Sequence, residues 1–229
     1  MDTIEFLFQK TFEIKMRFWY IKKVKKQTGR FGFRKGIISM DTKSLIVTEA
    51  TRLFYEKGYV SVGLAEIISA TNTSKGSFYH HFPKGKEQLL ITCLEKVQLD
   101  VIEDMEQHFV KHQRFKEAII SMFTELIRMF EEKGQIVGYT FTSMVSEIGV
   151  VSDEVREKCG SLYTRIEQVI ANQLQIRGVS LDIAQQKALM LTSLIEGSIM
   201  LSIMKRTSEP LHSVAQQIGQ YIEIGGEVF

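Results

Sequence analysis

The chain has few of the residues that cross-link a fold or interrupt helices. Its two cysteines, Cys93 and Cys159, form no CxxC pair, which argues against a metal knuckle or redox motif and favours reduced, buried thiols in a cytoplasmic protein. Only two prolines occur, Pro83 and Pro210, and the stretches between them show apolar residues with a 3.6-residue period and little strand-like alternation. The chain is therefore predicted to be all-α.

The sequence also lacks the common catalytic motifs. It contains no G-x-S-x-G, no nucleotide-binding loop, no paired-carboxylate motif and no tandem repeat, so we expect no enzyme, no cofactor and no metal. Asp104, His108 and His112 do share one helix face at i, i+4 and i+8. Such a pattern is far more often a solvated face than a metal site. A metal-dependent helical interaction protein remains the alternative function that these residues suggest.

No apolar run is long enough to make a convincing membrane span. Residues 188–204 carry one charge, Glu196, but they number seventeen and include hydroxyl side chains, whereas a span needs about 20 apolar residues. A soluble helix that is apolar nearly all round must be covered on both sides. We therefore expect a partner subunit rather than a membrane, with the helices at 181–206 and 211–224 forming a four-helix dimer face. Gly197 would allow close approach there.

The net charge of +2 hides a strong asymmetry. Residues 1–40 hold ten basic and three acidic residues, a balance of +7, and the remainder holds 19 basic and 24 acidic residues, a balance of −5. The first 40 residues, which are also rich in aromatics, are thus a separate basic extension. Three interpretations are open: an amphipathic helix that touches membrane or DNA, a disordered basic arm, or upstream sequence preceding a true start at Met40. The third is preferred, because a complete domain begins directly after Met40.

Apolar periodicity and capping residues predict nine helices after residue 40. Gly58 and Gly134 are expected to end helices, and Asn72 is expected to take the left-handed conformation of a tight turn. The predicted helices are 42–57, 64–70, 74–81, 86–109, 115–133, 139–149, 153–177, 181–206 and 211–224.

The stretch 74–86 is the most informative part of the sequence. It carries Lys75, Lys84, Lys86 and two histidines interleaved with aromatics, and it has no acidic residue. A short polar helix that follows the amphipathic segment 64–70 across a turn is how a helix-turn-helix presents a helix to DNA. Charge alone would be weak support, because residues 41–88 net only +1. The order of the residues carries the prediction.

That order resembles the TetR/AcrR family of transcriptional regulators across residues 41–229. The similarity is strongest in Leu64-Ala65-Glu66-Ile67, in 74–82 and in 86–89, and the run 79–87 together with 194–197 resembles the LmrA/YxaF-like subgroup. Two departures stand out: the turn has Asn72-Thr73 where Gly-Val is usual, and Val62 replaces a frequent Thr. The resemblance implies a cytoplasmic homodimer that binds a pseudo-palindromic operator on double-stranded DNA, with half-sites ~34–36 Å apart, and repression is the family default.

The resemblance also divides the chain into a DNA-binding domain at 41–88 and an effector-binding and dimerisation domain at 89–229. Phe78 and Phe82 are assigned to the core of the first domain. The residues expected to contact DNA are Ser74, Lys75, Gly76, Ser77, Tyr79, His80 and Lys86, with Lys75 as the best donor to guanine and Lys86 as a phosphate contact.

For the second domain, the resemblance implies a pocket that takes a small, largely apolar effector. Ten methionines favour an adaptable cavity, because Met fills irregular space. The expected pocket residues are Phe123, Phe141, Met144 and Tyr163.

Overall fold

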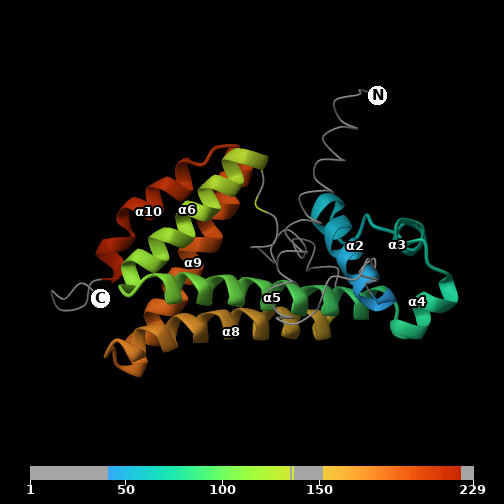
Figure 1. Cartoon of the computed structure of the whole chain (residues 1–229), viewed down its shortest axis with the longest axis horizontal. Coiled ribbons are helices and arrows are strands. Elements are labelled where there is room, and N and C mark those ends of the chain that lie inside the picture. Colours follow the sequence, from blue (N-terminus) through green and yellow to red (C-terminus); the bar gives the residue numbers. More distant parts are fainter. Residues whose placement is uncertain (1–40, 135, 137–151, 223–229) are drawn as a thin grey trace, which may run out of the picture. The chain divides into compact units, whose positions relative to one another are not determined.

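A computed structural model describes residues 41–134, 136 and 152–222 of the chain. The chain divides into two compact units, 1–39 and 40–229, and the described residues all belong to the second. Within them the structure contains eight helices and no strand (Figure 1). The prediction of an all-α fold is confirmed. The basic extension 1–40 and the helix predicted at 139–149 lie outside the described residues.

Three short helices form the first part of this unit, which we call the reading head: α2 (Thr42–Lys57), α3 (Leu64–Thr71) and α4 (Lys75–His81). Helix α2 begins where the Asp41 carboxylate accepts a 3.0 Å hydrogen bond from the Ser44 backbone N–H, and it ends at Gly58, whose φ is 79°. A positive φ of this kind suits glycine, which has no Cβ to clash. The sequence prediction of this helix end is confirmed.

The core of the reading head is built from one face of each helix. The apolar positions of α2 that recur at i, i+4, i+7 and i+8 are all buried: Ile46, Ala50, Leu53 and Phe54. They pack with Ile67 of α3, with Phe78 and Phe82 around α4, and with the beginning of α5 (Lys86–Lys111). The buried faces thus fix the orientation of α4 within the head.

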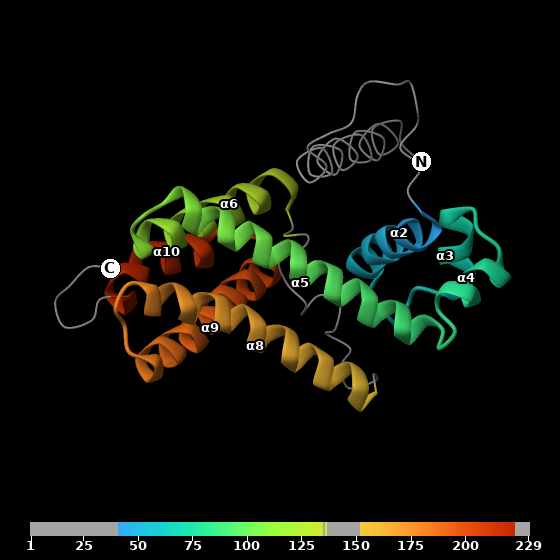
Figure 2. The ribbon, with the colours of Figure 1, turned by 60° about the horizontal axis from the view of Figure 1, so that its bottom comes forward.

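Helix α5 connects the reading head to the rest of the unit (Figure 2). It packs against α2, α6 (Phe115–Lys133) and α8 (Asp153–Ile176), and α8 already meets its first turn, where the Ser152 hydroxyl donates to the Glu87 carboxylate. The helix therefore runs through the boundary predicted between residues 88 and 89. Its buried residues follow the helical period from Leu90 to Phe109, so one face of α5 serves all three packing partners.

The remaining helices are α9 (Leu181–Lys205) and α10 (Glu209–Ile222), which pack against each other, with α8 on α9 and α10 on α6. The expectation that Pro210 precedes the last helix is wrong. Helix α10 begins at Glu209, the residue before Pro210, so that Pro210 lies in its first turn. Proline is tolerated there because the first backbone N–H groups of a helix have no intrahelical acceptor.

Helix α9 is the one helix of the described residues that is long and apolar enough to cross a membrane. Length and composition alone give that result, and the core helices of soluble proteins also satisfy them. Only about a third of the residues in the most apolar 18-residue stretch of α9 are buried within the protomer. Leu189, Leu201 and Met204 are 56%, 49% and 70% exposed. This exposed apolar face is consistent with the predicted cover by a partner subunit.

Candidate DNA-reading surface and effector pocket

The turn between α3 and α4 is held by its own side chains. Asn72 takes the left-handed conformation, with φ 50° and ψ 38°, as the sequence predicts. The Thr71 hydroxyl donates to the Ile67 carbonyl at 2.8 Å and lies 2.8 Å from the Thr73 hydroxyl. Ser74 then caps α4, because its hydroxyl oxygen accepts a 3.0 Å bond from the Ser77 N–H. Local hydrogen bonds therefore set where α4 begins.

Aromatic side chains anchor α4 on its buried side. Phe78 and Phe82 are fully buried, with ring centroids 5.4 Å apart, which confirms their assignment to the core of the head. The Phe78 ring also meets the Tyr79 ring edge-on at 5.4 Å. Such pairs add specific geometry to apolar burial. The anchor leaves the opposite side of α4 to solvent.

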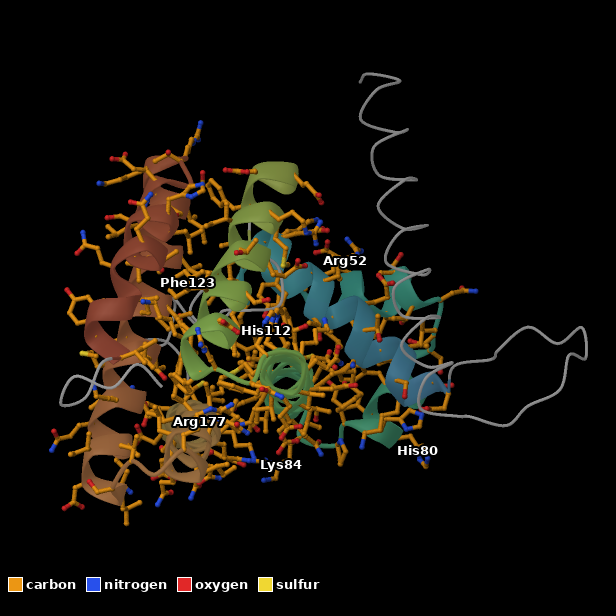
Figure 3. All side chains as sticks on the ribbon, turned by 60° about the vertical axis from the view of Figure 1, so that its left-hand side comes forward. Arg52, His80, Lys84, His112, Phe123 and Arg177 are labelled. Atoms are coloured by element: carbon orange, nitrogen blue, oxygen red, sulfur yellow. The ribbon has the colours of Figure 1, made fainter. Side chains whose placement is uncertain are left out.

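That opposite side carries most of the residues predicted to contact DNA. Ser74, Lys75, Gly76, Tyr79 and His80 are all exposed, and Ser77 is half-buried. Positions 76, 79 and 80 are spaced i, i+3 and i+4, so they share one face of the helix. Figure 3 shows His80 on the outer side of the head. The structure therefore brings six of the seven predicted DNA contacts together on α4 and its cap.

Lys86 is placed differently from the other six. Its ammonium donates a 2.5 Å hydrogen bond to the Tyr59 carbonyl and lies 4.2 Å from the centre of the Tyr59 ring. This contact ties the beginning of α5 to the segment between α2 and α3. In the structure the Lys86 ammonium therefore faces Tyr59. A phosphate contact by Lys86 stays a prediction.

The Asp104, His108 and His112 set has a structural explanation within the described residues. His108 is buried, with Nδ1 2.9 Å from the Ser121 hydroxyl and Nε2 3.5 Å from the Asp104 carboxylate. His112 is the C-cap of α5. In the part of the chain that the structure describes, no group of three His, Cys, Asp or Glu side chains is placed to hold a metal. His108 thus serves packing and hydrogen bonding between α5 and α6.

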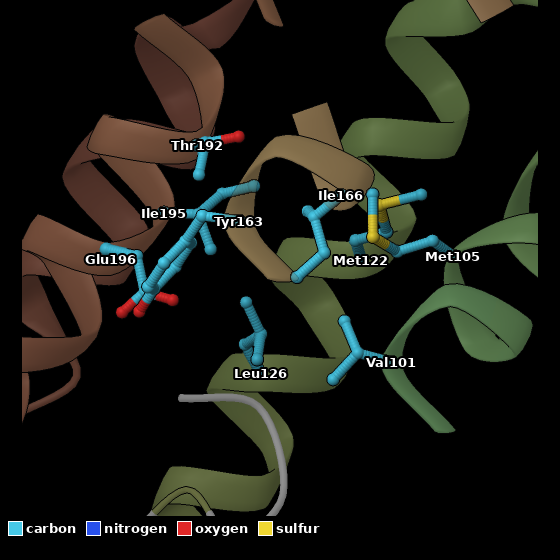
Figure 4. Close-up of a pocket in the computed structure, with 9 residues that line it drawn as sticks. All are labelled: Val101, Met105, Met122, Leu126, Tyr163, Ile166, Thr192, Ile195 and Glu196. Atoms are coloured by element: carbon cyan, nitrogen blue, oxygen red, sulfur yellow. The ribbon is translucent and has the colours of Figure 1, made fainter. Parts of the chain in front are cut away.

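The second site is a cavity of about 40 Å³ lined by residues of α5, α6, α8 and α9 (Figure 4). Its wall is mostly apolar, and its polar residues are Tyr163, Thr192 and Glu196. The described residues that line it are Val101, Met105, Met122, Leu126, Tyr163, Ile166, Thr192, Ile195 and Glu196.

Of the four residues predicted to line an effector pocket, Tyr163 does line this cavity. Phe123 is fully buried and belongs to the core instead of this wall. Phe141 and Met144 lie outside the described residues. Sequence reasoning missed the α9 residues Thr192 and Glu196. A signal for them existed: they are polar, one turn apart, within the helix that is otherwise apolar nearly all round.

The geometry defines a class of protein: an all-helical, helix-turn-helix DNA-binding protein whose later helices surround a small cavity. Family models agree. The model for bacterial regulatory proteins of the tetR family matches residues 46–93, and that for the C-terminal domain of LmrA/YxaF-like transcriptional regulators matches 116–217.

Two curated relatives come from Bacillus subtilis. The HTH-type transcriptional regulator YxaF is 32% identical over 78% of this chain and 93% of its own, and the HTH-type transcriptional regulator LmrA is 30% identical over 78% and 95%. Among solved structures, reduced NemR of E. coli superposes with a TM-score of 0.71 at 20% identity, covering 79% of this chain and 96% of its own. A TetR transcriptional regulator from Legionella pneumophila gives 0.69 at 19% identity, over 82% and 100%.

The chain therefore belongs to the TetR family of transcriptional regulators, in its LmrA/YxaF-like group. Members of this family are DNA-binding regulators rather than enzymes, and they act as dimers.

Proposed function

We propose that the protein is a cytoplasmic, homodimeric repressor that leaves its operator when a small, largely apolar molecule enters the α5–α6–α8–α9 cavity. The observation that carries the proposal is the course of α5. Its first turn follows α4 directly along the chain, and Val101 and Met105 of the same helix line the cavity. Lys86 and Met105 are nineteen residues apart, so about 28 Å of continuous helix separates the two sites.

DNA recognition is assigned to the exposed face of α4. Lys75 offers an ammonium to guanine O6 and N7, and the hydroxyls of Ser74 and Ser77 lie at the positively polarised beginning of the helix, which favours phosphate. Tyr79 and His80 add polar edges on the same face. Two copies of α4 would enter successive major grooves of a pseudo-palindrome about 34–36 Å apart.

The dimer is assigned to α9 and α10, whose exposed apolar residues have nothing to cover them within the described protomer. A cavity filled by an effector pushes on α5 and so changes the spacing of the two heads. The effector shifts this equilibrium only by the difference in its affinity for the two dimer shapes. The alternative function is a metal- or membrane-associated interaction protein. Its proposed metal ligand His108 is instead buried and bonded to Ser121 and Asp104, as described above. Its other basis, segment 1–40, lies outside the described residues.

The test is to capture genomic promoter fragments with the purified full chain and sequence them. We expect an inverted repeat, and a Kd that rises steeply with salt because phosphate contacts release counterions. Adding candidate apolar compounds to the complex should then raise the Kd for the operator. Absence of any preferred inverted repeat over scrambled DNA would refute the DNA-binding part. An operator affinity that no compound alters would refute the effector part.

A further inference from the structure

The three lysines of the stretch 74–86 are placed in three different ways. Lys75 is exposed on α4, and the Lys86 ammonium faces Tyr59. Lys84 lies in the turn that joins α4 to α5, and its side chain is 72% exposed (Figure 3). Lys84, rather than Lys86, thus presents its charge at the surface of this turn.

The backbone of this turn is fixed close to α4. Lys84 follows the last residue of α4, His81, by three residues, so its Cα lies at most about 11 Å from that helix end. Its backbone N–H donates a 3.0 Å hydrogen bond to the Gln88 side chain, and the Gly85 N–H donates a 2.8 Å bond to the carbonyl of the buried Phe82. Only the flexible Lys84 side chain therefore has to move to follow a ligand.

The ligand that this position suits is a DNA phosphate. A recognition helix in the major groove has sugar-phosphate backbone on both sides, and duplex DNA carries one negative charge per about 1.7 Å of its axis. Lysine is well suited to phosphate as a point charge on a long stem. When α4 lies in the groove, we expect a phosphate within reach of Lys84.

A carboxylate of α8 holds this ammonium in the structure. Lys84 Nζ lies 3.6 Å from Glu154 Oε1, and the Glu154 side chain is 64% exposed. The neighbouring Asp153 pairs with Arg156 of its own helix at 2.9 Å, whereas Glu154 reaches across to the reading head. Exposed pairs of this kind are weak and screened by salt, so a phosphate can displace Glu154 at little cost.

The start of α8 is kept beside α5 by contacts that follow one another along both helices. They are the hydrogen bond from Ser152 to Glu87, the 2.6 Å pair of Lys158 with Glu95, and the 2.9 Å bond from Gln98 Nε2 to the Leu162 carbonyl. Gln98 is buried, so the last of these contacts lies inside the protein. The packing of α8 on α5, rather than the weak pair itself, therefore sets Glu154 beside Lys84.

We propose that Lys84 is a further contact to operator phosphate and that Glu154 of α8 competes with the operator for it. The inference rests on the proposed DNA-binding function and adds a contact whose strength α8 controls. When the operator binds, a phosphate oxygen replaces the Glu154 carboxylate beside the Lys84 ammonium, and Glu154 is left to water. Each protomer of the dimer carries one such pair, so the effect counts twice.

The experiment measures the operator Kd of the full chain by fluorescence anisotropy over a series of salt concentrations. In Lys84→Gln the Kd should rise about 10-fold at low salt. The slope of log K against log salt should become shallower by about 1.8, because each of two phosphate contacts contributes about 0.9. In Glu154→Gln the Kd should fall about 3- to 10-fold at low salt, because the competing charge is gone.

The double variant Lys84→Gln/Glu154→Gln tests whether the two side chains act through each other. Without Lys84, loss of Glu154 should bring no gain, so the Kd should match that of Lys84→Gln within about twofold. Asp153→Asn is the matched control, since it removes one negative charge from the same turn of α8 but from the pair with Arg156. Its Kd should stay within about twofold of the parent.

An unchanged Kd and salt slope in Lys84→Gln overturn the proposal. It also fails if Glu154→Gln brings no gain, or if the gain persists in the double variant, because the carboxylate then acts by general repulsion of DNA. Both side chains are exposed, so thermal unfolding should show parent-like stability in every variant. A parent that prefers no inverted repeat refutes the proposed function together with this inference. A parent that binds its operator no better than Lys84→Gln does refutes this inference alone.

Discussion

The variant Gly76→Ala should have opposite effects on the stability of the fold and on the affinity for operator DNA. In the structure, a Cβ at position 76 would meet only the Ser74 hydroxyl oxygen, at 3.8 Å, which is an ordinary van der Waals distance. The residue is helical and exposed, so the added methyl meets no core atom. Alanine is favoured over glycine in helices, and because Gly76 lies in the first turn we expect a gain of about 0.5 kcal/mol, or roughly 1–2 °C in Tm.

On DNA the same methyl should be harmful, because we propose that the backbone of α4 approaches the groove closely at this point. If each half-site loses about 1 kcal/mol, the dimer loses about 2 kcal/mol, which is roughly a 30-fold rise in Kd. Fluorescence anisotropy with the captured operator measures the Kd, and thermal unfolding measures the stability. Gly160→Ala is the matched control: its Cβ meets nothing within 4 Å on α8, so it should stabilise the protein and leave the Kd unchanged.

The reasoning fails if Gly76→Ala binds the operator as tightly as the parent, since the backbone then does not approach DNA at this position. A fall in Tm of several degrees would instead show that position 76 is more crowded than the structure indicates.

Four further predictions follow from single side chains. Lys75→Ala should cost about 1–3 kcal/mol of operator affinity by anisotropy, and an unchanged Kd would remove Lys75 from the contacts. Thr192→Val should raise the Tm by about 2–4 °C, because it deletes a buried hydroxyl without a described partner, worth about 1 kcal/mol; a lower Tm would reveal such a partner. Gly197→Leu should leave the monomer folded, since its Cβ position is open, but weaken the dimer in sedimentation equilibrium; unchanged association would place the interface elsewhere. Burial raises the pKa of Cys93 to about 12 from an ordinary 9.0, so its contribution to stability is present below about pH 9 and lost as the pH rises toward 12. Urea unfolding should show a shallower decline over this range in Cys93→Ala, and equal slopes would contradict it.

Local features of the sequence were enough to place most helices and their ends. The left-handed Asn72 and the terminal Gly58 and Gly134 were predicted and are confirmed, and the apolar face of α2 and the Ser74 cap follow the same short-range rules. Each depends on contacts within a few residues along the chain, which periodicity and capping rules describe well. Pro210 was misplaced because proline is compatible both with the residue before a helix and with its first turn.

The exposed side of α4 was also predictable, since the buried aromatics Phe78 and Phe82 identify the opposite face. The direction of the Lys86 ammonium was not. It bonds to Tyr59, 27 residues earlier, and only the packing of α2 against α5 brings the two together.

The sequence by itself thus determined an all-helical regulator with a helix-turn-helix, because caps, turns and apolar periods are short-range properties. The tertiary structure alone decided which faces of α5, α6, α8 and α9 surround a cavity. Tyr163 lines it and Phe123 does not, although both are large aromatics on apolar helix faces. A cavity is the space that several packed helices fail to fill, and that remainder depends on their crossing and on every side chain between them.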